Sequence, residues 1–293
     1  MSDSEVAINP IVQGFFDPAT NTISYIIHDP VTRAAAIVDP VLDFTSRNGH
    51  ISSVSADALL HEVEAQGLQL KWLLETHAHA DHLSAAHYLR DRTRAPIVIG
   101  KQIVEVLAHF AEMFEADDVA LDGRAFDRLV GDGDVLTLGS LNIHVMHTPG
   151  HTPACVTYLV GDAAFIGDTV FMPDYGTARS DFPGGDAATL YRSIRTILEL
   201  PLDTRLFTGH DYPPPLRAEP AWEASVARHR SVNVHVHDGV SEAEFVSMRH
   251  ARDATLAPPM LILPSLQVNI RAGQMPPASP GGHVYLRIPV NAI

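Results

Sequence analysis

Three histidines and one aspartate fall within six consecutive positions in the segment Glu75-Thr76-His77-Ala78-His79-Ala80-Asp81-His82. An apolar run at 70–74 precedes this segment, and a pattern that predicts a helix over 83–93 follows it. Each of the four side chains needs a polar partner once it is buried, so a core without a ligand is a costly place for them. Imidazole nitrogens combined with a carboxylate oxygen are typical of catalytic zinc or iron sites. The segment therefore predicts a metal centre.

The spacing within this cluster indicates two groups of ligands. Residues two apart on an extended segment point the same way, so His77 and His79 can reach one ion as the strand ends. Asp81 and His82 then turn past that ion toward a second position. The alternative is an exposed histidine-rich turn, which fits a lone histidine better than it fits four ligand side chains at a strand end.

Three later apolar segments also end in histidine or aspartate. They are His151 after 141–146, Asp168 after 163–166, and His210 after 205–207. Gly150 allows a sharp turn that directs the His151 imidazole back across its strand end, whereas we expect His147, earlier in the loop, not to be a ligand. One such residue alone usually caps a helix or pairs locally. Four strand ends of a layered αβ architecture, however, can converge into one site.

The remaining pattern predicts the elements that carry these side chains. Strands are predicted at 22–28, 34–39, 68–74, 96–99 and 155–160. Helices are predicted from a cap at Ser55 to Gly67, over 103–115 and 219–230, and from a capping box at Ser241 to about 252. We expect 117–134 to form a surface loop and 257–293 to form an extension with a last strand at 284–288. Together the pattern predicts one domain over 1–293, in which 213–293 is a C-terminal helical and extended appendage.

Composition limits the classes of partner. The 293 residues can bury a sizeable core, and the formal charge of −15 at pH 7 argues against nucleic acid or an anionic membrane as partner. Cys155 is the only cysteine, which excludes an internal disulfide, and its apolar neighbours predict a buried structural thiol. The polar, acidic start at 1–5 lacks the features of a secretory signal. We therefore expect a cytoplasmic protein.

The ordered motifs resemble those of the metallo-β-lactamase superfamily. They are His77-Ala78-His79-Ala80-Asp81-His82, Pro149-Gly150-His151-Thr152, Gly167-Asp168 and Gly209-His210-Asp211. The resemblance implies an αββα sandwich, with two mixed β-sheets face to face and helices outside. The segments 173–194, 235–240, 251–256 and 262–269 resemble the persulfide dioxygenase (sulfur dioxygenase) branch, particularly bacterial β-lactamase hydrolase-like proteins, and that branch is related to glyoxalase II. Two departures are Ser180, where this branch predicts Cys, and the absence of a phosphatase-like domain that is often fused.

The dioxygenase branch implies a single Fe(II) held by His77, His151 and Asp168, with open positions for O₂ and a persulfide sulfur. The other candidate ligands would then orient these groups and hold water; they are His79, Asp81, His82 and His210. The implied reaction converts glutathione persulfide, O₂ and water into glutathione and sulfite.

The glyoxalase II branch implies a different use of the same side chains, in a hydroxyacylglutathione hydrolase that binds one or two Zn(II) ions and cleaves a thioester. Here the first metal would be held by His77, His79 and His151. The second would be held by Asp81, His82 and His210, and Asp168 would bridge the two.

Substrate contacts are the least determined part of the site. Arg179 and Asp181 match an Arg-x-Asp-Phe stretch of the family and are expected to pair and brace the centre, with a surface ion pair as the alternative. Glutathione carries two carboxylates, for which Arg179, Arg192 and Arg195 are candidate cations. Tyr191 and Tyr212 could donate to substrate or simply pack. We also expect a homodimer or a higher homo-oligomer.

Overall fold

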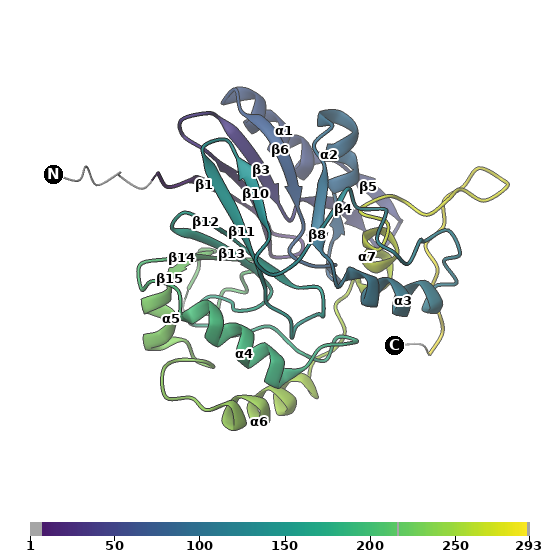
Figure 1. Cartoon of the computed structure of the whole chain (residues 1–293). Coiled ribbons are helices and arrows are strands. Elements are labelled where there is room, and N and C mark those ends of the chain that lie inside the picture. The colour runs from purple at the N-terminus through teal and green to yellow at the C-terminus, as the bar shows by residue number, and fades with distance from the viewer. Residues whose placement is uncertain (1–7, 216, 292–293) are drawn as a thin grey trace.

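The structure is a computed structural model that describes residues 8–215 and 217–291. Two six-stranded sheets pack face to face, with helices on both outer sides (Figure 1). The first sheet contains, in spatial order, β1 (Ile11–Asp17), β2 (Thr22–His28), β3 (Ala34–Val38), β6 (Gln69–Leu74), β8 (Ile97–Gly100) and β9 (Arg128–Val130). The second contains β10 (Val135–Leu138), β11 (Leu141–His147), β12 (Val156–Val160), β13 (Ala163–Gly167), β14 (Arg205–Thr208) and β15 (Glu223–Ser225). A small sheet is formed by β5 (His50–Ser52), β4 (Val41–Thr45) and β7 (Leu83–Ser84).

Both large sheets are mixed. In the first, β1, β2 and β3 are antiparallel neighbours, whereas β3, β6, β8 and β9 run parallel. In the second sheet, as far as the structure describes it, β13 and β14 run parallel, and all other neighbouring strands are antiparallel. These sheets and their helices confirm the predicted αββα sandwich.

The space between the sheets is filled by apolar and aromatic side chains. Tyr25 of β2 packs edge-on against Phe165 of β13, with ring centroids 5.3 Å apart, and Phe165 stacks on Phe207 of β14 at 5.1 Å. The Tyr25 hydroxyl donates to the Thr208 carbonyl at 2.5 Å, so the buried phenol is satisfied. This cross-sheet packing joins β2 of the first sheet to β13 and β14 of the second.

Helices cover the two outer faces. Those packed into the apolar cluster outside the first sheet are α1 (Val54–Ala65), α2 (Ala86–Thr93), α3 (Ile103–Met113) and α7 (Ile262–Asn269). Those outside the second sheet are α4 (Ala187–Leu198), α5 (Val226–Val232) and α6 (Glu242–Asp253). The capping box predicted at Ser241 is confirmed: its hydroxyl accepts from the Glu244 amide, and the Glu244 carboxylate accepts from the Ser241 amide.

Several predicted elements are wrong. Ser55 does not cap α1, because the helix begins one residue earlier and the Ser55 hydroxyl donates to Asp43 at 2.6 Å. The segment 117–134 contains β9, which pairs with β8, and the predicted helix 219–230 is instead β15 followed by α5. Pairing with a neighbouring strand overrides the local pattern in both segments.

The C-terminal extension also differs from the prediction. It contains the helix α7, and no strand forms over 284–288 in the described chain. There the backbone N–H and C=O of Arg287 bond the Gln267 side chain, at 2.7 and 2.9 Å, in place of a partner strand. Across residues 8–215 and 217–291, no helix combines the length and the apolar character that crossing a membrane requires. The interpretation of the segment 1–5 lies outside the described residues.

Candidate metal centre

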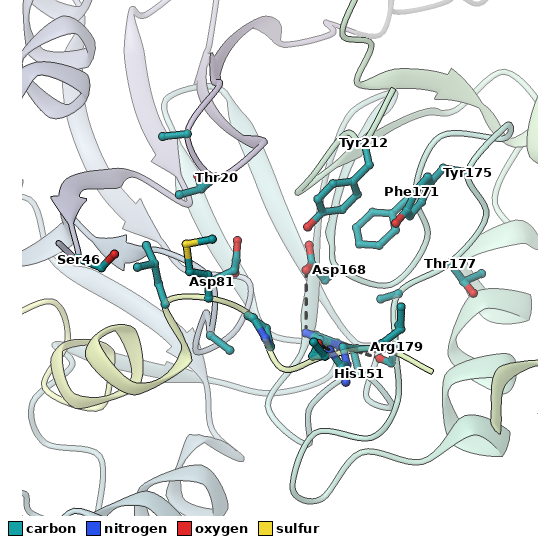
Figure 2. Close-up of a pocket in the computed structure, with 18 of the residues that line it drawn as sticks. Thr20, Ser46, Asp81, His151, Asp168, Phe171, Tyr175, Thr177, Arg179 and Tyr212 are labelled. Atoms are coloured by element: carbon teal, nitrogen blue, oxygen red, sulfur yellow. Dashed lines mark hydrogen bonds and ion pairs between the residues drawn. The ribbon is translucent and has the colours of Figure 1, made fainter. Parts of the chain in front are cut away.

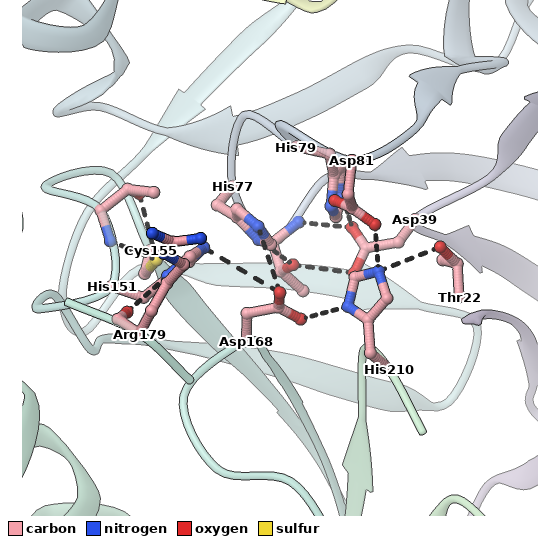
Figure 3. Close-up of polar contacts among 12 residues, drawn as sticks. Thr22, Asp39, His77, His79, Asp81, His151, Cys155, Asp168, Arg179 and His210 are labelled. Carbon is pink, nitrogen blue, oxygen red and sulfur yellow. Dashed lines mark hydrogen bonds and ion pairs between the residues drawn. The ribbon is translucent and has the colours of Figure 1, made fainter. Parts of the chain in front are cut away.

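Four strand ends meet between the two sheets and bring the predicted ligand side chains together (Figure 3). They follow β6, β11, β13 and β14 and carry His77, His79, Asp81, His82, His151, Asp168 and His210. All of them are buried except Asp81, which is partly exposed. The two sheets also touch here, because the Ile23 amide donates to the Gly209 carbonyl at 2.8 Å. The sequence spacing therefore identified side chains that do share one location.

Within this location His77, His151 and Asp168 form one compact set. The Nε2 atoms of His77 and His151 lie 4.0 and 3.9 Å from Oδ2 of Asp168, which is too long for hydrogen bonds. The three ligand atoms lie within 4.8 Å of one another. Nε2 of His77 is buried and has no hydrogen-bond partner. An unpartnered buried imidazole nitrogen that faces a second imidazole and a carboxylate fits a shared metal ion.

The outer nitrogens of both histidines show which atoms face the centre. Nδ1 of His151 lies 2.8 Å from the Arg179 carbonyl, which can only accept, so Nδ1 donates there and Nε2 is the nitrogen that faces the centre. The Thr76 hydroxyl donates to Asp39 at 2.7 Å and therefore accepts from Nδ1 of His77 at 3.0 Å. Burial, followed by the neighbouring His79 and His151, lowers the pKa of His77. In both rings Nδ1 is thus occupied by an outer partner, so Nε2 is the atom directed to the centre, as metal ligation requires.

Gly150 gives His151 its position. Its φ of +133° suits glycine, and an added Cβ would lie 2.3 Å from the Leu190 backbone of α4. The turn that the sequence predicted at this glycine is therefore present, and it requires close approach of a helix. His147 does not join the cluster, because its Nε2 bonds the Pro153 carbonyl at 2.9 Å. Cys155 is buried, and burial raises the pKa of its thiol to about 12, which agrees with the predicted structural thiol.

His210 lies between two carboxylates. Its Nδ1 is 2.7 Å from Oδ1 of Asp168, and its Nε2 contacts Oδ2 of Asp81. Burial opposes protonation, but the charges of Asp168 and Asp81 outweigh it and raise the pKa of His210 well above its ordinary value. The His210 ring thus bridges the Asp168 carboxylate to the Asp81 carboxylate.

His79 turns toward a pair of carboxylates that the sequence reasoning missed. Its Nε2 lies 3.0 Å from Oδ1 of Asp39 and 3.2 Å from Oε2 of Glu75. Burial lowers the pKa of His79, but the charge and hydrogen bond of Asp39 and those of Glu75 raise it to about 10. Asp39 directly follows the buried strand β3, which is the same signal that identified Asp168. The same reasoning could therefore have found it.

The family stretch around Arg179 forms a brace beside the centre. Arg179 donates to both carboxylate oxygens of Asp181, at 2.5 and 2.7 Å, and to the Ala257 carbonyl at 2.8 Å. Ser180, at the position where Cys was expected, donates through its amide and its hydroxyl to Asp253 of α6, at 3.0 and 3.2 Å. The loop that supplies the carbonyl bonded to His151 is therefore tied to α6.

A cavity of about 560 Å³ opens onto the centre (Figure 2). Asp81, His151 and Asp168 line its inner end, and its aromatic wall is made by Phe171, Tyr175 and Tyr212. In Figure 2 the Tyr212 hydroxyl points into the cavity beside Asp168. Arg47 and Arg252 also line the cavity, and neither forms an ion pair with any described residue.

Three predicted substrate contacts lie outside this cavity. The Tyr191 hydroxyl donates to the Val240 carbonyl at 2.7 Å, which is a packing role. Arg192 pairs with Glu242 at 3.1 Å, and Arg195 pairs with Asp238 at 3.0 Å. These residues join α4 to the α5–α6 region, so their placement does not favour contact with a substrate at the metal centre.

The chain is similar in sequence to several known proteins. A probable metallo-hydrolase of Burkholderia pseudomallei is 53% identical, over 96% of this chain and 99% of its own length. A β-lactamase hydrolase-like protein of Xylella fastidiosa is 50% identical over 97% of this chain, which spans 65% of that longer protein. Human mitochondrial persulfide dioxygenase ETHE1 is 31% identical over 69% of this chain and 68% of its own length.

The fold and the family model agree with these relatives. The crystal structure of ETHE1 from Myxococcus xanthus superimposes with a TM-score of 0.72 at 31% identity, covering 90% of this chain and all of that one. The family model described as metallo-beta-lactamase superfamily matches residues 20–210, a range that contains every candidate ligand. The chain therefore belongs to the metallo-β-lactamase superfamily.

Proposed function

We propose that this protein is a mononuclear non-haem iron persulfide dioxygenase, which uses O₂ and water to convert glutathione persulfide into sulfite and glutathione. One observation carries the proposal. His77, His151 and Asp168 face one another through atoms that are not hydrogen-bonded together, whereas His79 and His210 are each engaged by carboxylates. The similarity to proteins named persulfide dioxygenase supports the same activity.

Two histidines and one carboxylate suit Fe(II), which when bound would supply open coordination positions for O₂ and for the persulfide sulfur. The protein's own part is to hold these ligands and to shape the cavity. Because His210 donates to Oδ1 of Asp168, the other oxygen, Oδ2, is left to face His77 and His151. His79, Asp81 and His82 would support this set without ligating the metal.

The cavity provides the features that a thiol carrier with carboxylates requires. Phe171, Tyr175 and Tyr212 form an aromatic wall that would exclude water from the sulfur end of the substrate. Arg47 and Arg252 are cavity-lining guanidinium groups that are not neutralised by a described carboxylate. We assign the carboxylates of glutathione to these two arginines, in place of Arg192 and Arg195.

A zinc-dependent hydrolase of glyoxalase II type is the second candidate. It is favoured by the ligand atoms of His79, Asp81 and His82, which also lie within 4.8 Å of one another, and by a relative named probable metallo-hydrolase. Zinc bound there would lower the pKa of water and polarise a thioester carbonyl. In this arrangement Nδ1 of His79, which is buried and has no hydrogen-bond partner among the described residues, would be the ligand atom, while Nε2 keeps Asp39 and Glu75.

Metal analysis and oxygen uptake separate the two candidates. Protein purified without oxygen is expected to contain one iron per chain, to consume O₂ only when glutathione persulfide is added, and to form sulfite. An Asp168→Ala variant provides the control that lacks a metal ligand. Protein that carries zinc, consumes no O₂ with the persulfide and cleaves a glutathione thioester would overturn the dioxygenase assignment in favour of the hydrolase.

A further inference from the structure

Asn269, the last residue of α7, contacts the backbone of the loop that carries four candidate metal ligands. Its Nδ2 donates to the carbonyls of His79 and His82, each at 2.8 Å. Its Oδ1 accepts from the Ser84 amide, also at 2.8 Å. The side chain is 4% exposed, and both its N–H groups and its oxygen are used. The family model ends at residue 210, so this contact comes from outside the matched segment.

Asp39 holds the start of this loop, and Asn269 contacts its later part. Residues 75–82 lie between β6 and β7 and belong to no helix or strand. Buried carbonyls need a donor, and the Asn269 amide supplies one to the carbonyl on each side of the Ala80-Asp81 pair. Fixing these two peptide planes fixes the direction in which Asp81 and His82 leave the backbone. Among the described residues, Asp39 makes three hydrogen bonds to Thr76 and His79, whereas Asn269 bonds the carbonyls of His79 and His82 and the Ser84 amide.

We infer that Asn269 is a positioning residue for the metal centre: it holds the backbone of residues 79–84 in the conformation from which Asp81 contacts His210, and His210 in turn bonds the proposed ligand Asp168. The inference rests on the proposed metal-dependent function. It assigns to α7 a role in forming the centre, in addition to its apolar packing against the first sheet. Chemical groups that orient metal ligands typically change metal affinity by about 10- to 100-fold when they are removed.

Gln267 provides a matched control on the same helix. It is 2% exposed, and its amide also makes three hydrogen bonds: to the carbonyls of Leu263 and Arg287, and from the Arg287 amide. None of these partners lies in the metal loop. A Gln267→Ala variant therefore removes equivalent buried hydrogen bonds while leaving the loop contacts in place.

The experiment compares Asn269→Ala, Asn269→Asp and Gln267→Ala with the unmodified chain. Asn269→Asp keeps the acceptor for Ser84 and removes both donors, so it is the variant of choice if the alanine variant does not fold. Iron affinity is measured by competition with a chelator, and amide hydrogen exchange over residues 79–84 is measured in metal-free protein. We expect both Asn269 variants to bind iron about 10- to 100-fold more weakly and to exchange faster in this loop. Gln267→Ala is expected to match the unmodified chain in both measurements.

Two results overturn the inference: normal iron affinity and normal loop exchange in Asn269→Asp, or equal losses in Gln267→Ala, which indicate general destabilisation. Failure of the proposed function looks different. If the unmodified chain binds no iron, the dioxygenase assignment falls, while the exchange measurement in metal-free protein still decides whether Asn269 holds the loop.

Discussion

Nδ1 of His210 lies 2.7 Å from Oδ1 of Asp168, and the other oxygen of the same carboxylate faces His77 and His151. The Asp168 carboxylate thus connects His77 and His151 on one side to His210 on the other. The two oxygens have different contacts: Oδ1 is bonded by His210, and Oδ2 is directed to the candidate metal position. The one-metal arrangement proposed above rests on this division.

The first prediction concerns metal content. Asp168→Ala removes the only carboxylate of the triad and is expected to reduce bound iron from about one per chain to near zero. His82→Ala removes a side chain that the proposal places outside the ligand set, so bound iron is expected to stay near one. Elemental analysis of protein purified without oxygen provides the measurement. Two metals in the unmodified chain and one in His82→Ala would contradict the single-metal arrangement.

The second prediction concerns substrate recognition. Arg252→Gln removes a cavity-lining charge, and the loss of one charge-assisted hydrogen bond is expected to raise KM for glutathione persulfide about 10-fold with kcat little changed. Steady-state O₂ uptake measures both constants. Arg192→Gln is the matched control, because Arg192 lies outside the cavity and pairs with Glu242. A similar KM for the Arg252→Gln and Arg192→Gln variants would show that Arg252 does not bind the substrate.

The third prediction concerns pH and the buried His229 of α5. Burial lowers the pKa of His229 to about 4, and the Asn233 amide lies 3.2 Å from its Nδ1, as a neutral imidazole requires. In the unfolded chain the pKa of His229 has its ordinary value of 6.5. Between these values the unfolded chain takes up a proton that the folded chain does not. The contribution of His229 to the free energy of unfolding is therefore complete above pH 6.5. It decreases by about 3 kcal/mol as the pH falls toward 4.

Urea unfolding of metal-free protein at several pH values between 7 and 4 tests this prediction. His229→Gln cannot take up the proton in either state, so its free energy of unfolding is expected to depend less steeply on pH than that of the unmodified chain. Parallel pH curves for the two proteins would show that another group causes the acid destabilisation.

The fourth prediction concerns the tie between the Arg179 loop and α6. Asp253→Ala leaves Arg249, which is 1% exposed, without its carboxylate at 2.6 Å, and is expected to cost about 3–5 kcal/mol of unfolding free energy. Ser180→Cys keeps the amide bond to Asp253 and weakens only the hydroxyl bond, so about 1 kcal/mol or less is expected. Urea unfolding measures both values. A stability of Asp253→Ala close to that of the unmodified chain would contradict this account.

Much of the centre could be predicted because strand-end spacing is a local property. A strand of the sheet directs the residue that follows it to the sheet edge, so His77, His151, Asp168 and His210 could be chosen before any coordinates were known. The sandwich itself followed from the resemblance of the ordered motifs. Cytoplasmic location, oligomeric state and a single domain over the whole chain stay predictions.

The sequence by itself determined the inventory and order of the ligand side chains. Tertiary structure decided their partners: Asp39 holds His79 from 40 residues away, and Asn269 holds the same loop from 190 residues away. In the folded chain Tyr191 and Arg192 also lie outside the cavity, and Arg252 lines it. The physical reason is that backbone periodicity sets the direction of a side chain relative to its own strand or helix. Which distant group it meets depends on how the two sheets and their covering helices pack.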